Sequence, residues 1–320
     1  MIKNIKNIKL VTHSGPFHAD DVTAVAIALL AHRNDAYSVD VARSRNPEII
    51  AAADLVFDVG GVYDPDMGRF DHHQSRPESP ADTWGETPLS SAGMAWKKFA
   101  GHVIHNLWPS ASVGQIKQVR DTIYDSTIKW IDQMDVGVGP FAADSGLAAA
   151  TLSGVIGDLN ISGPATPYEV DARFMEAVAI VKQVLIGKVL KVAWGVALPD
   201  VLRSNHAGME VVVLDHPVET TMVAELLPEA KLVVHPSDGQ WMVLCVPPTR
   251  EEWTKQRAPF PERMAGLRGF ALSEALEDGP AKEDASQDDG SRCFVHGYRF
   301  CGGMRSRDAA IDLAQQVLKG

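Results

Sequence analysis

The sequence Phe70-Asp71-His72-His73-Gln74 follows closely on the apolar stretch Leu55-Val56-Phe57-Asp58-Val59-Gly60-Gly61. Asp71 lies thirteen residues after Asp58, and two consecutive histidines follow it. Carboxylates and imidazoles in this combination are typical ligands of divalent transition metals. The stretch therefore predicts a metal centre that also draws ligands from other parts of the chain.

The chain upstream of this stretch predicts a sheet whose strand ends carry polar residues. Residues 8–13, 37–42 and 55–58 are apolar and predict strands, and residues 22–31 and 47–53 between them predict helices. This alternation is typical of an α/β fold with a mostly parallel sheet flanked by helices. Ligands of such sheets bind at the carboxyl ends of the strands, where His13 and Asp58 both fall.

The rest of the sequence predicts a long helical region followed by a second, smaller α/β domain. We expect domains at residues 1–195 and 196–320, because the composition changes around 195–208. The first domain should contain a loop at 75–88 and helices at about 90–107, 113–134, 146–158 and 168–193. The second should contain strands at 211–214, 231–235, 241–246 and 294–296, a surface loop at 278–291, a Gly302-Gly303 turn and a helix at 306–319.

The composition argues against a protein with a generally basic surface and against a membrane-spanning protein. Of the 320 residues, 45% are hydrophobic and 22% are charged, which is ordinary for a globular chain. The formal net charge of −11 argues against a generally basic nucleic-acid surface, although a local basic groove remains compatible with it. The three cysteines form no C-x-x-C pair, and we find no membrane span or signal sequence, so we expect a cytoplasmic protein without membrane contact.

Strand ends and helix termini together supply four imidazoles and four carboxylates as candidate ligands. Taken singly, Asp20 could cap a helix, Asp58 could form a turn, and Asp135 could mark a helix end. As a set, the mixture favours Mn²⁺, Zn²⁺ or Fe²⁺ over Ca²⁺ and is large enough for two metal ions that share one carboxylate. The eight candidates are His13, His18, Asp20, Asp58, Asp71, His72, His73 and Asp135.

These motifs resemble the DHH phosphoesterase superfamily and, more closely, its melanocyte proliferating gene 1 (Myg1-type) family of metal-dependent hydrolases. The resemblance runs almost from end to end of the chain. It rests on stretches 12–20, 58–65, 69–74 and 89–93, on Asp135-Val136-Gly137, and on the later stretches 267–269, 293–296 and 300–303. It implies an N-terminal DHH-type catalytic domain and a C-terminal substrate-binding domain.

The resemblance also implies roles for the metal-site residues. One metal would be held by His13, His18 and Asp58, and the other by Asp20, Asp58, His72 and Asp135. His73 would contact the scissile phosphate, and Asp71 would orient a ligand histidine. The superfamily more often has Asp at the position of His18, and Asp132 is an alternative to Asp135 as the last ligand.

In the C-terminal domain, the resemblance implies a phosphate-binding site near a Gly-Gly turn. Backbone N–H groups and guanidinium groups both suit phosphate oxygens. The superfamily often has His directly after the two glycines, whereas this chain has Met304. The implied substrate-binding residues are Gly302, Gly303, Arg305, Arg268 and His296.

The implied activity is 3′–5′ exonucleolytic hydrolysis of RNA or short oligonucleotides by a hydroxide that two divalent metal ions activate. Mn²⁺ is the expected metal, with Mg²⁺ and Zn²⁺ as alternatives. One alternative function is a small-molecule phosphatase or pyrophosphatase that uses the same site. Another is a catalytically silent metal-binding regulatory protein. The oligomeric state stays open, with a homodimer as one possibility.

Overall fold

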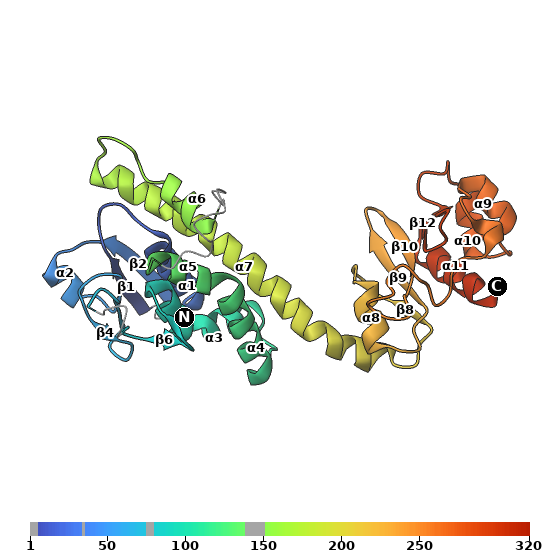
Figure 1. The fold of residues 1–320 in the computed structure, drawn as a ribbon. Helices are drawn as coiled ribbons and strands as arrows, with labels where there is room; N and C mark the ends of the chain where they lie inside the picture. The colour runs from blue at the N-terminus through green and yellow to red at the C-terminus, as the bar shows by residue number, and fades with distance from the viewer. Residues whose placement is uncertain (1–5, 34–35, 75–79, 138–150) are drawn as a thin grey trace, which may run out of the picture. The chain divides into compact units, whose positions relative to one another are not determined.

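The computed structural model of the chain describes residues 6–33, 36–74, 80–137 and 151–320. These residues form two compact units, Met1–Ala197 and Leu198–Gly320, each with its own sheet and core (Figure 1). The division falls after residue 197, against residue 195 in the sequence-based prediction. The catalytic and substrate-binding roles of the two units remain predictions.

The first unit is built on a five-stranded sheet with the order β2-β1-β3-β5-β4. Strands β2, β1, β3 and β5 run parallel to one another, and β4 pairs antiparallel with β5. This mostly parallel sheet confirms the predicted α/β class. The strands are β1 (Lys6–Thr12), β2 (Tyr37–Arg43), β3 (Leu55–Phe57), β4 (Tyr63–Asp64) and β5 (Arg69–Phe70).

Helix α1 (Ala19–Ala31) is the central helix of this unit and is buried along almost its whole length. Its small side chains allow helix α3 (Ser91–Leu107) to pack closely against it. Burying a Val, Leu or Ile side chain contributes roughly 1.5–3 kcal/mol, so Val22, Val25, Ile27 and Leu30 stabilise α1 chiefly through packing. The other helices are α2 (Pro47–Ala51), α3 (Ser91–Leu107), α4 (Val113–Ile123), the π-helical segment η1 (Tyr124–Ile128), α5 (Lys129–Asp135), α6 (Leu152–Asp158) and α7 (Pro167–His206).

The register of the sheet brings the polar residues after three strands to one edge. Val11 of β1 pairs with Val56 of β3, and Phe57 pairs with Phe70 of β5. His13, Asp58 and Asp71 therefore follow neighbouring parallel strands at their carboxyl ends, which is the edge where α/β sheets bind ligands.

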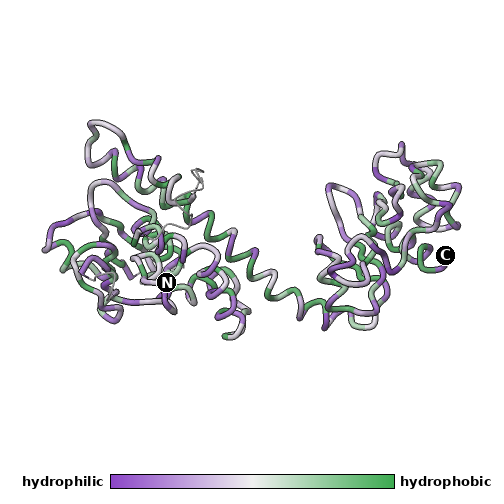
Figure 2. Tube along the Cα trace, in the orientation of Figure 1, coloured by the Kyte–Doolittle hydropathy of each residue, from purple (hydrophilic) through white to green (hydrophobic). Residues whose placement is uncertain are grey.

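Helix α7 is longer than the sequence pattern predicts, because it continues to His206 rather than ending near 193. Phe174, Val181 and Val189 belong to the core of the first unit, and Leu198 and Leu202 belong to a core of the second. Hydrophobic and hydrophilic residues alternate along the helix (Figure 2). Each part of α7 thus has an apolar face for the unit it packs against.

Two details of the first unit differ from prediction. The predicted loop at 75–88 contains a small hairpin, β6 (Thr83–Trp84) and β7 (Thr87–Pro88), while its first part, 75–79, lies outside the described residues. The predicted helix at 113–134 is interrupted by η1. The first residues of the helix predicted at 146–158, up to 150, also lie outside the described part of the chain.

The second unit has a five-stranded sheet in the order β11-β12-β10-β9-β8, in which only β8 and β9 pair in parallel. Among the described residues, no helix of the protein is both long and apolar enough to cross a membrane. The elements of this unit are β8 (Val211–Val213), α8 (Thr220–Leu226), β9 (Leu232–Ser237), β10 (Gln240–Cys245), the 3-10 helix η3 (Glu262–Met264), α9 (Gly269–Ala275), α10 (Pro280–Ser286), β11 (Phe294–Val295), β12 (Cys301–Met304) and α11 (Arg307–Lys319).

The predicted Gly302-Gly303 turn is wrong, because both glycines lie inside strand β12 between β10 and β11. A Cβ atom on Gly303 would lie 2.7 Å from Cε1 of Phe294 and 2.8 Å from the backbone oxygen of Arg292. The glycine is needed because a neighbouring strand and an aromatic ring approach the backbone closely.

The predicted surface loop at 278–291 is also wrong, since it contains helix α10. Pro280 occupies the first helical turn, where proline is well tolerated. Ala281 and Ala285, four residues apart, bury one face of this helix. The acidic composition of the segment concealed this short apolar face.

We predict that Gly68→Ala destabilises the first unit by about 2–5 kcal/mol, because it combines a left-handed backbone with a steric clash. Gly68 has φ +70°, and a Cβ there would lie 2.3 Å from the backbone oxygen of Asp54. Gly85→Ala is the matched control, with φ +59° and no atom within 4 Å of the added Cβ among the described residues, and should cost about 1–2 kcal/mol. Urea unfolding followed by circular dichroism measures both, and equal losses would contradict the role of the clash.

Candidate metal centre

Five elements of the first unit bring the candidate ligands together at the edge of the sheet. His13 follows β1, Asp58 follows β3 and His72 follows β5. Asp20 lies in the first turn of α1, and Asp135 is the last residue of α5. Strand ends and two helix termini thus converge on one point, as the sequence predicts for ligands of an α/β sheet.

The first donor group consists of His13, His18 and Asp58, each with a ligand atom within 4.8 Å of the others. Nε2 of His13 lies 3.3 Å from Oδ2 of Asp58. The rings of His13 and His18 lie 5.8 Å apart between centroids. These three residues are the set expected to hold the first metal.

The second donor group consists of Asp20, His72 and Asp135. Nε2 of His72 lies 3.2 Å from Oδ2 of Asp135 and 3.8 Å from Oδ2 of Asp20. The same nitrogen lies 3.3 Å from Oδ1 of Asp58. Asp58 therefore faces His13 with one carboxylate oxygen and His72 with the other, so the two donor groups meet at this carboxylate.

His73 lies beside both groups but is held mainly by Asp71. Nδ1 of His73 is 2.8 Å from Oδ1 of Asp71 and 3.4 Å from Oδ1 of Asp58. Asp71 Oδ1 also accepts the backbone N–H of His73, while its Oδ2 accepts the N–H of Gly61. Asp71 thus orients the histidine expected to contact phosphate. His73 also forms a third donor group with Asp58 and His72, so a ligand role is a geometric alternative.

Asp21 is a residue of the centre that the sequence analysis did not select. It is fully buried, and its Oδ2 lies 3.1 Å from Nε2 of His13. Its Oδ1 accepts the backbone N–H of His18 and so caps α1. The consecutive acids Asp20-Asp21 were a usable signal, because one carboxylate suffices for the cap and leaves the other for the centre.

The electrostatics of the cluster suit divalent cations. Both carboxylate oxygens of Asp20 are buried and have no hydrogen-bond partner among the described residues. Burial raises the pKa of the Asp20 carboxyl well above its ordinary value, and the nearby charges of Asp58, Asp135 and Asp21 raise it further. Buried, crowded carboxylates of this kind require a cation or a proton, and the mixed nitrogen and oxygen donors fit a transition metal.

The loop that carries His18 is fixed by side chains from two other segments of the first unit. Asn160 accepts the backbone N–H of Phe17 at 2.9 Å and donates to the backbone oxygen of Phe17 at 2.9 Å. Arg43 donates to the backbone oxygen of Gly15 and forms an ion pair of 3.0 Å with Asp171 of α7. The loop between His13 and His18 is therefore held in place by side chains from β2 and from the residues after α6.

Asp132 is the alternative last ligand, and the structure places it against α3 instead. Its Oδ1 accepts hydrogen bonds from the backbone N–H and the hydroxyl of Ser90 and from the N–H of Gly93. Burial raises the pKa of the Asp132 carboxyl to about 7. A Cβ on Gly93 would lie 2.3 Å from Asp132 Oδ2, so the glycine makes room for this carboxylate. Asp135, three residues later, is the carboxylate that reaches the cluster.

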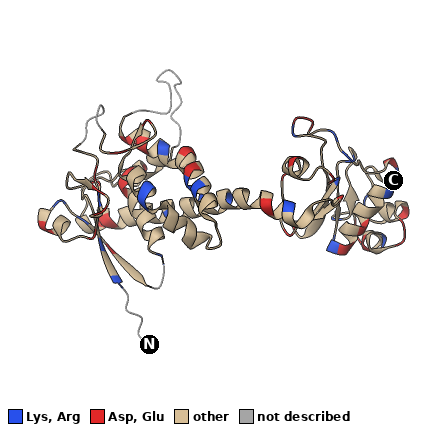
Figure 3. Cartoon of the chain, turned by 90° about the horizontal axis from the view of Figure 1, so that it is seen from below, with Lys and Arg blue, Asp and Glu red and all other residues tan. Residues whose placement is uncertain are grey.

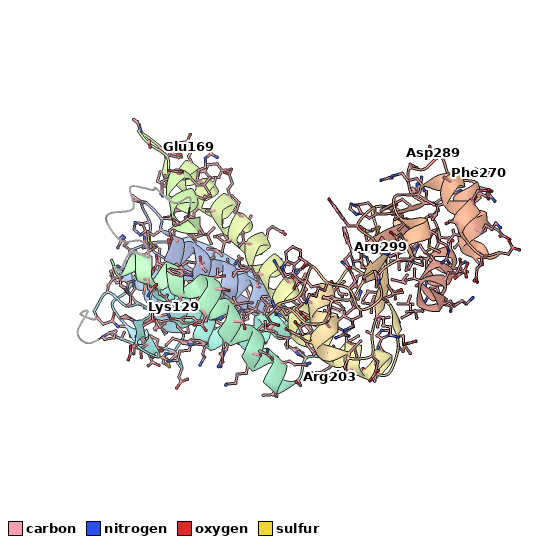
Figure 4. The ribbon with its side chains drawn as sticks, turned by 45° about the vertical axis from the view of Figure 1, so that its right-hand side comes forward. Lys129, Glu169, Arg203, Phe270, Asp289 and Arg299 are labelled. Atoms are coloured by element: carbon pink, nitrogen blue, oxygen red, sulfur yellow. The ribbon has the colours of Figure 1, made fainter. Side chains whose placement is uncertain are left out.

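The predicted substrate-binding residues lie in the second unit and are held by local contacts. The backbone N–H of Arg305 donates to Asp284, and the guanidinium of Arg268 lies 5.0 Å from the ring centre of Phe294. The His296 ring lies 4.6 Å from that of Phe300. Figure 4 labels Arg299, the neighbour of Phe300. A role of these residues in substrate binding remains a prediction.

We predict that Asn160→Ala weakens binding of Mn²⁺ at the His13–His18 group by about tenfold, because losing a residue that supports a metal ligand typically costs 10–100-fold. Asn106→Ala is the matched control, since Asn106 also donates to backbone oxygens, those of Leu30 and Ala31 at the other end of α1. Isothermal titration of the metal measures both variants. An unchanged affinity in Asn160→Ala, or an equal loss in the control, would contradict the role of Asn160.

Comparisons with known proteins agree with the family resemblance of the sequence motifs. A family model described as an uncharacterised protein family, MYG1_exonuc (UPF0160), matches residues 9–318. The protein named MYG1 exonuclease of Bos taurus is 29% identical over 97% of this chain and 84% of its own length, and that of Homo sapiens is 29% identical over 97% and 85%. The MYG1 protein of Dictyostelium discoideum is 27% identical over 98% of this chain and 97% of its own length. The family model covers almost the whole sequence, which confirms the resemblance seen in the motifs: the chain belongs to the MYG1 family.

Proposed function

We propose that this protein is a metal-dependent phosphodiester hydrolase that acts as a 3′–5′ exonuclease on RNA or short oligonucleotides. The observation that carries the proposal is the Asp58 carboxylate, which faces His13 on one side and His72 on the other. A carboxylate shared by two donor groups suits two cations, and paired cations are a common device for phosphodiester hydrolysis.

The residues of the two donor groups would hold the metals. His13, His18 and Asp58 form one set, and Asp20, Asp58, His72 and Asp135 form the other. Bound divalent cations, with Mn²⁺ our expected choice, would lower the pKa of a water molecule and neutralise charge on the phosphate. A cavity of about 500 Å³ opens beside the centre and is lined in part by His18, Asp20 and Asp135, so a substrate phosphate has access to it.

His73 is the residue best placed to contact that phosphate. Its side chain is 62% exposed, whereas that of Asp71 is only 2% exposed. Since Asp71 holds Nδ1, the ring presents Nε2 as the nitrogen that can reach a phosphate oxygen. The hydrogen bond with Asp71 raises the pKa of His73 and so favours the imidazolium form, in which Nε2 also carries a hydrogen. A donor positioned in this way stabilises charge that develops on phosphate oxygens during displacement.

Family membership supports a hydrolytic, exonuclease-like enzyme, because bovine and human relatives carry the name exonuclease. The RNA substrate and the 3′–5′ direction rest on the motif resemblance. The net charge of −11 and the mixture of acidic and basic residues on both units (Figure 3) favour short substrates over long duplexes. The cysteines Cys245, Cys293 and Cys301 are buried and unpaired, which supports a reducing compartment such as the cytoplasm.

We predict that His72→Ala lowers kcat/KM by more than the 10–100-fold typical of losing a residue that only supports a ligand. The substrates are 5′-labelled RNA, single-stranded DNA, a dinucleotide and pyrophosphate, each assayed with Mn²⁺, Mg²⁺ or Zn²⁺. Cleavage from the 3′ end gives a ladder of shortened labelled products, whereas cleavage from the 5′ end releases the label at once. His105→Ala, an exposed histidine on α3, is the control and should retain full activity.

The same assay separates the alternatives. Turnover of pyrophosphate alone would replace the nuclease with a small-molecule hydrolase that uses the same centre. Stoichiometric metal without turnover of any substrate would favour a regulatory metal-binding protein. Equal activity of His72→Ala and the unmodified protein would overturn the assignment of the centre.

We further predict that His73→Gln keeps both metals but lowers kcat by about 10²–10³-fold, the usual effect of removing one donor to a developing oxyanion. Elemental analysis of the purified variant measures metal content, and steady-state kinetics on the RNA substrate measures kcat. If His73 is instead a ligand, as its third donor group allows, the metal content falls together with the rate.

A further inference from the structure

A second cavity adjoins the metal centre on the side of α5. It has a volume of about 400 Å³ and is lined by residues of η1, α5, α6 and α7, including Thr127, Trp130 and Lys188. This volume lies in the range of sites that enclose small organic ligands. The lining residues that the structure describes all belong to the first unit.

The two cavities share walls. Ile131 and Met134 of α5 and Ser153 of α6 line both the apolar cavity and the one that contains His18, Asp20 and Asp135. Both cavities therefore lie along α5 and α6, and the metal centre is at one end. Figure 4 labels Lys129, the first residue of α5, which immediately precedes Trp130.

Trp130 gives the second cavity a flat aromatic surface. The residue is 46% exposed, although tryptophan is highly buried on average. Trp130 lies five residues before Asp135, and at 1.5 Å per residue this separates them by about 7.5 Å along the helix axis. Five residues also turn the helix by about 140°, and Ile131 and Met134, which lie between Trp130 and Asp135 on α5, line both cavities.

The remaining lining residues offer polar groups around this aromatic surface. Ser126 and Thr127 belong to the π-helical segment, and such segments are frequent at functional sites. Lys188 of α7 adds a cation. An apolar cavity with a few converging polar groups is the usual form of a small-molecule site.

We infer that this cavity is a nucleoside subsite, in which a base of the substrate stacks on Trp130 while its phosphate lies at the metal centre. The inference rests on the proposed function, because it assumes that a nucleotide phosphate binds there. Stacking on an aromatic side chain tolerates every base, so the subsite recognises a nucleotide without selecting its sequence. It thereby distinguishes nucleotides from phosphoesters that lack a base.

The test compares binding of adenosine 5′-monophosphate and ribose 5-phosphate to the Mn²⁺-loaded protein by equilibrium dialysis. Trp130→Ala should weaken binding of the nucleotide by about tenfold or more and leave binding of ribose 5-phosphate unchanged, since only the nucleotide has a base to stack. Trp130→Phe should stay within about threefold of the unmodified protein, because it keeps an aromatic ring. Trp253→Ala is the matched control, since Trp253 is 70% exposed and lies in the second unit.

The outcomes separate this inference from the proposed function. Equal nucleotide affinity in Trp130→Ala and the unmodified protein overturns the subsite, even if RNA is hydrolysed. An equal loss for both ligands also overturns it, because the residue would then act on the phosphate site or the fold. A selective loss of nucleotide binding supports the subsite, even in a protein that fails to cleave RNA and so fails the proposed function.

Discussion

The buried carboxylate of Asp58 is the constraint on which the rest of the site depends. Its backbone has φ +56°, a left-handed conformation that aspartate tolerates better than most residues, and its N–H donates to the backbone oxygen of Phe70. This places one carboxylate oxygen toward His13 and the other toward His72. Strained backbone of this kind persists where the surrounding structure fixes it, often at functional sites. A central strand end flanked by β1 and β5 provides that support.

The surrounding elements compensate for the burial of so much charge. Asp20, Asp21 and Asp58 are almost completely enclosed, and unpaired buried charges are strongly unfavourable. Part of the compensation is internal, since Asp21 caps α1 and Asp71 binds two groups of His73. The rest must come from protons or cations, because the oxygens of Asp20 have no donor among the described residues. Metal binding and the stability of this edge of the sheet are therefore coupled.

The sequence was sufficient to predict where the residues that follow strands lie. It was not sufficient for residues whose position depends on the rotation of a helix about its axis. His13, Asp58 and Asp71 could be placed together because parallel strands end at one edge. Asp132 and Asp135 could not be told apart, since both lie near the end of α5 and only packing against Ser90 and Gly93 assigns Asp132 to α3. The glycines of β12 suggested a turn because a sequence does not reveal which ring or strand approaches the backbone.

The π-helical segment η1 explains how residues of the following helix α5 contact α3, the metal centre and the apolar cavity. An α-helix turns by about 100° per residue. The extra residue of a π turn therefore rotates the side chains of the following helix by about that angle around the helix axis. Before η1, Val119 and Ile123 pack into the core. After it, Asp132 points to α3, Asp135 points to the metal centre, and Trp130 lines the apolar cavity. Because Trp130 and Asp135 share one short helix, their spacing is fixed by the backbone, and a substrate held by both would be positioned by a rigid element rather than by a loop.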